Sequence, residues 1–266
     1  MTEALTIYRR SQLEAVSDGC LHRIKAIWYE GTEDTSDIAM IGIGFHACQH
    51  RYTLALVDAG LVSDSELALQ AFKDGVASVQ TPARLLPELR RVWMQHAERW
   101  ECPLSTFVAA EEKGQGDDKG FTPDLVTADP KTNTLEIQDF KSGWQPIMSE
   151  EELRDLYQAR FYIRYGRQRW PAFDRYKFTL HAVRFNKSVS VVFTHAELDQ
   201  IEVEVEANIA TLKRAIETDH WPAIAGPSCR FCTLRCPIAS QPMAVPKRIL
   251  EPAELQKISG LVMAGD

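Results

Sequence analysis

The sequence contains no apolar run that approaches the roughly 18 residues needed for a membrane-spanning helix. Its first residues, MTEALTIYRR, lack the basic segment followed by an apolar one that marks a secretory signal. There is also no internal repeat and no low-complexity linker. These absences argue against a membrane protein, a secreted protein and a repeat array. We therefore expect a cytoplasmic protein with no membrane partner.

Cysteine and positive charge are both scarce. The chain has six cysteines in 266 residues and a net charge of −7. In a reducing compartment, so few cysteines favour metal binding, catalysis or burial over a disulfide framework. The acidic balance counts mildly against nonspecific coating of nucleic acid, which depends on Lys and Arg. The remaining composition, 45% hydrophobic and 25% charged, is typical of a globular protein.

The periodicity predicts helices first, then strands, then a long helix. We expect helices over 11–29, from residue 42 onward, over 64–79 and over 82–100, and strands within 104–112, 124–129 and 134–141. A capping box of Ser149 and Glu152 predicts a helix through Tyr165. Strands at 177–185 and 188–194, a helix at 196–218 and a short helix at 253–262 follow.

This order predicts one α/β domain over 1–266, in which helices flank a mixed, mostly antiparallel sheet. Residues 1–103 form a helical N-terminal portion, 104–195 the core sheet and its helix, and 196–266 the C-terminal helix and a cysteine cluster.

The stretch EIQDFKSG places opposite charges on one face of a strand. Because alternate strand residues share a face, Asp139 and Lys141 point the same way as Leu135 and Ile137. Burial of two charges is costly unless they have partners or a function. The plain alternative is a salt-bridged strand end that reaches solvent.

A second acid, Asp124, precedes Asp139 by 15 residues on the strand expected to form a hairpin with it. Two carboxylates on adjacent strands can hold divalent cations through hard oxygen ligands. A lysine beside them can orient water or neutralise charge on a phosphate. The pattern therefore suits metal-assisted phosphodiester cleavage.

Three of the cysteines lie together in CRFCTLRCP, with the spacing C-x2-C-x3-C, at Cys229, Cys232 and Cys236. Such a cluster in a reducing compartment indicates zinc or an iron–sulfur cluster, and either needs a fourth ligand. The candidates for that ligand are Cys20, Cys48 and Cys102.

Basic and aromatic residues alternate between residues 160 and 177, which suits contact with a nucleic-acid strand. The alternative is an amphipathic helix with a solvated basic face. The predicted DNA-binding residues are Arg160, Arg164, Arg167 and Arg169.

The Pro-Asp pair at 123–124 and DFK at 139–141 resemble the signature of the PD-(D/E)XK nucleases. The surrounding motifs resemble the RecB-like branch, which includes AddB-type and CRISPR-associated exonucleases. GIGFH at 42–46 is similar to its G-x-x-x-H helix, and QARFY at 158–162 to its Q-x-x-x-Y helix. Residues four apart share a helix face, so both side chains of the second motif can face the site.

The resemblance implies a restriction-endonuclease-like core with a Mg²⁺ or Mn²⁺ site. Its metal ligands would be His46, Asp124, Asp139 and the backbone carbonyl of Phe140. Its further catalytic residues would be Lys141, Gln158 and Tyr162. Gly120 lies four residues before Asp124, where the family has two or three, which leaves Asp129 as a competitor. Glu111 or Glu112 is a further candidate acid.

The resemblance also implies a 4Fe–4S cluster in which Cys20 joins Cys229, Cys232 and Cys236, as a clasp between the N- and C-terminal regions. The family often has proline after the first cysteine, and here Leu21 follows it. The expected function is a metal-dependent DNA exonuclease in recombination, repair or DNA processing. The alternative is a noncatalytic iron–sulfur scaffold in a helicase–nuclease or CRISPR-type complex. DNA is the expected partner, with a helicase, recombination or CRISPR protein as a further one.

Overall fold

The computed structural model describes residues 10–17, 20–26, 36–111, 121–144 and 147–225. The predicted helix at 253–262 and the clustered cysteines at 229, 232 and 236 lie outside these residues. The N-terminal helices of the described chain are α1 (Arg10–Ser17), α2 (Leu21–Ile24), α3 (Asp37–Ala59), α4 (Ser65–Ser78) and α5 (Leu86–Ala97). Among the described residues, no helix is both long and apolar enough to cross a membrane.

The sheet has five strands in the order β1-β2-β3-β4-β5. Neighbouring strands are antiparallel except β3 and β4, which are parallel. Helices α6 (Glu150–Asp155) and α7 (Tyr157–Arg169) make the crossover that this parallel pair needs. The sheet is thus mixed and mostly antiparallel, as predicted. Its strands are β1 (Phe107–Ala109), β2 (Leu125–Asp129), β3 (Thr134–Lys141), β4 (Arg175–Ala182) and β5 (Lys187–Phe193).

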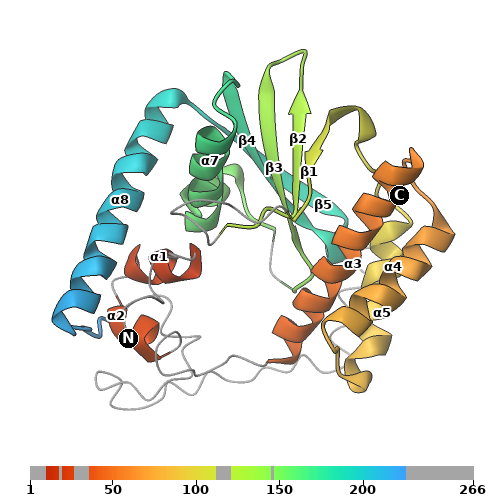
Figure 1. Ribbon diagram of the computed structural model, residues 1–266, viewed down its shortest axis with the longest axis horizontal. Coiled ribbons are helices and arrows are strands. Elements are labelled where there is room, and N and C mark those ends of the chain that lie inside the picture. The colour runs from red at the N-terminus through yellow and green to blue at the C-terminus, as the bar shows by residue number, and fades with distance from the viewer. Residues whose placement is uncertain (1–9, 18–19, 27–35, 112–120, 145–146, 226–266) are drawn as a thin grey trace.

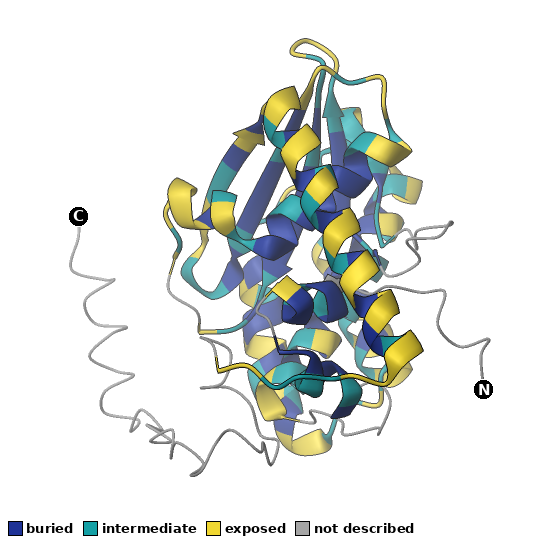
Figure 2. Cartoon of the chain, turned by 90° about the vertical axis from the view of Figure 1, so that its left-hand side faces the viewer, coloured by how far each residue is buried: buried dark blue, intermediate teal, exposed yellow. Residues whose placement is uncertain are grey.

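Helices cover both faces of the sheet (Figure 1). On one face lie α1, α7 and α8 (His195–Thr218), and on the other α3, α4 and α5. The side chains of β3 alternate between two apolar cores: Leu135 and Ile137 pack under α7, whereas Phe140 packs toward α5. Figure 2 shows the strands largely buried behind a helix layer whose outer side is exposed.

Helix α7 lies close against β3 because Gly166 has no side chain. A Cβ at Gly166 would come within 2.7 Å of the Cδ1 of Ile137. Gln158, two turns earlier on the same helix, then lies over Asp139 further along the strand, where its amide donates to the carboxylate at 2.6 Å. The apolar half of the strand therefore sets the position of α7 over its charged half.

Three predicted boundaries are wrong. Helix α3 begins at Asp37, five residues before Gly42, because Ser36 caps it by accepting from the N–H of Ala39. The predicted helix 149–165 is two helices, since Leu156 has an extended ψ of 118°. The turn after β4 is a 3₁₀ turn, Val183–Phe185, which ends at the left-handed Asn186. The capping box of Ser149 and Glu152 is confirmed.

The basic side chains of α7 face the acidic side chains of α8. Arg164 is only 3% exposed and binds Glu202 at 2.9 Å and Glu206 at 2.7 Å. Arg160 pairs with Glu204, and Arg167 with Asp199 at 2.7 Å. Arg169 lies 5.5 Å from the ring centre of Trp170.

These contacts correct the predicted DNA-binding surface. The structure does not support a DNA-binding role for Arg164, because burial and two carboxylates keep its guanidinium away from any strand. Arg160 and Arg167 are also neutralised by acids of α8, and Arg169 packs beside an indole. The sequence pattern could not reveal this, since the partners lie more than 30 residues further along the chain. Arg160, Arg164 and Arg167 therefore join α7 to α8, and we leave all four arginines out of the proposed DNA path.

We expect Arg164→Ala to lower the free energy of unfolding by about 2 kcal/mol, because charge-assisted hydrogen bonds to a buried guanidinium are lost. Arg167→Ala is the matched control. Its side chain is 35% exposed and pairs with one exposed acid, so we expect a loss below about 1 kcal/mol. Urea denaturation of the two variants measures the difference. Equal, small losses would contradict the structural role of Arg164.

Candidate active site

Two carboxylates meet at the open end of the β2–β3 hairpin. Asp124 directly precedes β2, and Leu125 pairs with Gln138, so Asp124 lies beside Asp139 and Phe140. The backbone N–H of Phe140 donates to Oδ2 of Asp124 at 2.7 Å. Asp124 is 7% exposed and Asp139 is 2% exposed. The hairpin therefore buries two acids side by side, as the sequence predicted, and both need compensating charge.

His46 on α3 supplies the compensation for Asp124. Its Nδ1 lies 3.1 Å from Oδ1 of Asp124. Burial alone would lower the pKa of His46, but the negative charge of Asp124 outweighs it and raises the pKa to about 9. Burial alone would raise the pKa of Asp124, but the positive charge of His46 and the Phe140 N–H outweigh it and lower the pKa. Without metal, the two groups form an ion pair at neutral pH.

Lys141 and the α7 helix supply the compensation for Asp139. The Nζ of Lys141 lies 2.8 Å from Oδ2 of Asp139. The amide of Gln158 donates to the other oxygen, Oδ1, at 2.6 Å. Tyr162, one turn after Gln158, lines the same cavity, and its ring packs edge-on at 4.6 Å from that of Phe121. Both residues of the Q-x-x-x-Y motif thus face the carboxylates.

Glu111 also lies at this site, whereas Glu112 is outside the described residues. A carboxylate oxygen of Glu111, an oxygen of Asp124 and a ring nitrogen of His46 all lie within 4.8 Å of one another. Glu111 has a left-handed φ of 49°, and its N–H donates to the carbonyl of Pro123 at 2.9 Å. This sharp bend after β1 turns its side chain to the site. Strand alternation could not predict it, because the bend breaks the alternation.

Asp129, the competitor of Asp124, caps the β2–β3 turn instead. Its carboxylate accepts from the N–H of Lys131 at 2.9 Å and from the hydroxyl of Thr132 at 2.8 Å. These hydrogen bonds are typical of an Asp that shapes a turn. Asp124 is therefore the acid at the candidate active site.

The acids line a cavity of about 660 Å³ between α3, α7 and the sheet. The basic residues of the lining that sequence reasoning did not assign to the site are His50 and Arg51, which lie one turn beyond His46 on α3. His50 shares a helix face with His46, and that spacing was the available signal. The other residues that line the cavity are Ile43, His46, Ala47, Ser78, Val79, Glu111, Asp124, Asp139, Lys141, Gln158 and Tyr162.

These donors fit a hard divalent cation. Carboxylate oxygens and one imidazole are suitable ligands for Mg²⁺ or Mn²⁺. The Nδ1 of His46 and Oδ2 of Asp139 are buried and have no well-aligned hydrogen bond among the described residues, although each lies near an opposite charge. Both atoms would become available to a metal once His46 loses its proton and Lys141 moves away from Asp139. His46, Asp124 and Glu111 are already grouped, and Asp139 is next to them.

The described cysteines are all buried and free of disulfides among the described residues. The Sγ of Cys48 packs against Gly75, where a Cβ would come within 2.7 Å of it. Burial raises the pKa of Cys48 to about 12 and also raises that of Cys102. Thiols kept protonated by apolar surroundings serve packing rather than metal binding. Cys20 is buried and immediately precedes α2.

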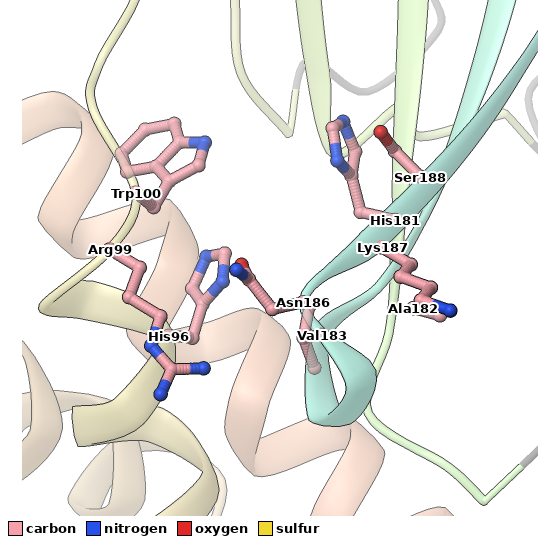
Figure 3. A pocket seen from close by; sticks show the side chains of 9 residues that line it. All are labelled: His96, Arg99, Trp100, His181, Ala182, Val183, Asn186, Lys187 and Ser188. Atoms are coloured by element: carbon pink, nitrogen blue, oxygen red, sulfur yellow. The ribbon is translucent and has the colours of Figure 1, made fainter. Parts of the chain in front are cut away.

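A second, smaller cavity of about 110 Å³ is lined by residues from the end of α5, the end of β4 and the start of β5. Figure 3 shows His96, from α5, and His181, from β4, on either side of it. The rings of both histidines contact that of Phe140, with centroids 5.4 and 4.7 Å away. Burial lowers the pKa of His96 to about 3 and that of His181 to about 4. These neutral rings pack the side chain of Phe140, whose backbone N–H holds Asp124.

We expect the His46 imidazole of the metal-free protein to titrate near pH 9 in an NMR experiment, and near or below pH 6.5 in Asp124→Asn, where burial prevails. Because the pKa of His46 is raised in the folded state, its protonated imidazole stabilises the fold below about pH 6.5. That contribution is lost as the pH rises from about 6.5 to about 9. In Asp124→Asn, the free energy of unfolding should therefore depend less on pH between about 6.5 and about 9. An unchanged His46 titration in the variant would contradict the ion pair.

Comparison with protein families agrees with this geometry. The model of the PD-(D/E)XK nuclease superfamily matches residues 20–237. No curated protein matches the chain significantly. The matched region contains Asp124, Asp139 and Lys141 in the cavity, together with the five-stranded sheet that carries them. The chain therefore belongs to the PD-(D/E)XK nuclease superfamily, a family of metal-dependent nucleases.

Proposed function

We propose that this chain is a Mg²⁺- or Mn²⁺-dependent deoxyribonuclease of the RecB-like group, acting as an exonuclease in DNA recombination, repair or processing. The observation that carries the proposal is the convergence of His46, Asp124, Asp139 and Lys141 from three elements on one cavity. A protein that only bound DNA would not need two buried acids grouped with a histidine and a lysine.

The metal would be held by His46, Asp124, Asp139 and the carbonyl of Phe140, with Glu111 as a further ligand. Once bound, it would supply an activated water and stabilise the leaving oxygen. To accept it, His46 must lose its proton, and the ion pair with Asp124 is replaced by two metal ligands.

The remaining residues would act around the metal. The Nζ of Lys141 would turn from Asp139 toward the phosphate, where it orients the water or neutralises charge that develops in the transition state. Gln158 would hold one oxygen of Asp139 so that the carboxylate keeps its orientation when Lys141 moves. Arg51 at the cavity wall would contact the backbone of DNA.

The direct test is cleavage of labelled single- and double-stranded DNA with Mg²⁺ or Mn²⁺. We expect Lys141→Ala to lower the cleavage rate by about 100-fold or more with little change in DNA affinity, because its charge acts in the transition state. Asp139→Asn should abolish cleavage and keep the fold. Lys187→Ala, which changes an exposed lysine at the start of β5, is the control and should cleave normally.

DNA binding without cleavage by the wild-type protein, with either metal, would contradict the nuclease proposal. That outcome would favour the second candidate, a noncatalytic scaffold in a helicase–nuclease or CRISPR-type complex. Wild-type rates in Asp139→Asn would contradict the assignment of the metal site.

We further propose that Cys20 joins Cys229, Cys232 and Cys236 in a 4Fe–4S cluster. The latter three lie outside the described residues, but the chain approaches Cys20 before it reaches them. The N–H of His22 donates to the carbonyl of Pro222 at 3.1 Å, and Lys25 pairs with Asp219 at 2.9 Å. Pro222 is seven residues before Cys229, within reach of Cys20. The clasp would close a loop of about 200 residues.

We expect the purified protein to be brown, and Cys20→Ser to lose visible absorbance and thermal stability, because one of four thiolate ligands is missing. Cys48→Ser is the control. The Cys48 thiol packs between α3 and α4, so the colour of this variant should match that of the unsubstituted protein. Absorbance spectra and metal analysis of both variants distinguish iron from zinc, which is colourless. A brown, stable Cys20→Ser protein would show that the fourth ligand lies elsewhere.

A further inference from the structure

An exposed tryptophan lies three residues after the catalytic lysine. Trp144 is 49% exposed, although it follows a strand whose side chains are mostly buried. Three residues span at most about 11 Å, so Trp144 lies near the cavity that contains Lys141. The intervening Ser142 lies against α3, with its hydroxyl 3.9 Å from where a Cβ of Gly42 would be. The chain between Lys141 and Trp144 therefore passes beside the helix that carries His46.

The indole is held in place rather than free to move. The guanidinium of Arg184 lies over its ring, 4.6 Å from the centroid. The ring of Phe185 meets it edge-on at 6.1 Å. Because these residues follow β4 directly, the sheet itself supports the exposed indole.

Arg184 is itself fixed. Its side chain is 5% exposed, donates to the carbonyl of Ser142 and pairs with Glu88 of α5. Hydrogen bonds from Arg91 and, to a smaller extent, from Arg184 outweigh burial and lower the pKa of Glu88 to about 2. The ion pair therefore persists over the working range of pH. Because Glu88 already neutralises its charge, Arg184 serves to hold the indole ring of Trp144 and does not need to bind phosphate.

An exposed, immobilised aromatic ring loses little conformational entropy when a flat ligand stacks on it. Nucleobases have such a face, and stacking on an aromatic side chain is the common way to hold single-stranded DNA without reading its sequence. Lys141 and Arg51, both at the nearby cavity, provide positive charge for the adjoining phosphates.

We propose that Trp144 is a stacking platform for an unpaired base next to the phosphodiester that is cleaved. The inference rests on the proposed nuclease function and adds that the strand in the site is single-stranded there. A base inside a duplex has both faces covered by its neighbours, so away from a duplex end stacking on Trp144 requires an unpaired or unstacked nucleotide.

The test compares two probes in an Asp139→Asn background, so that neither is cleaved. One is a short single-stranded oligonucleotide, and the other has the same backbone with abasic linkers in place of its bases. We expect Trp144→Ala to weaken binding of the first by about 5- to 100-fold and to leave the second unchanged. Trp144→Leu, which keeps apolar bulk without a flat ring, should behave like Trp144→Ala, and Trp144→Phe should retain most of the affinity.

Ile38→Ala is the control, because Ile38 is a 67% exposed apolar residue on α3 and should not affect either probe. Equal binding of both probes by the unsubstituted background protein would overturn the platform and leave the nuclease proposal intact. A Trp144→Ala variant that loses stability but keeps its preference for bases would show that the indole packs on the chain itself. Binding of neither probe, together with no cleavage by wild type, would remove both proposals.

Discussion

The structure depends on the burial of two carboxylates at the start of one hairpin. Asp124 and Asp139 lie in a region of low dielectric, where uncompensated charge is costly. Each has one cation and one neutral donor: His46 and the Phe140 N–H for Asp124, Lys141 and Gln158 for Asp139. These partners come from α3, β3 and α7. The requirement to balance two acids thus fixes both helix layers against the same end of the sheet.

The same balance explains how the site can accept a metal. The carboxylates of Asp124 and Asp139, the protonated imidazole of His46 and the ammonium of Lys141 are together neutral, so these four groups balance one another without a metal. A divalent cation would replace the proton of His46 and release Lys141 from Asp139, which frees the ammonium for the phosphate. The lysine would then be available for chemistry only when the metal is present. The rings of His96 and His181 pack the side chain of Phe140. This packing supports the hydrogen bond from the Phe140 N–H to Asp124.

The sequence was sufficient for most of the fold and for the grouping of the site residues. Strand alternation placed Asp139 and Lys141 on one face, and helical spacing placed Gln158 and Tyr162 over them, because both periods are geometric. The sequence alone could not choose between Glu111 and Glu112, because the left-handed backbone of Glu111 breaks the strand alternation. It also misjudged the arginines of α7, whose acidic partners on α8 are distant in sequence. Local patterns reveal which face a residue occupies, and only tertiary packing reveals what covers that face.

The central claim is that His46, Asp124 and Asp139 hold a divalent cation. Anomalous scattering from crystals of the protein with Mn²⁺ would test it directly, because the signal locates manganese without reference to activity. We expect a peak within coordination distance of His46, Asp124 and Asp139, and no such peak in Asp124→Asn. Manganese bound only elsewhere, or bound equally at this position in Asp124→Asn, would contradict the account.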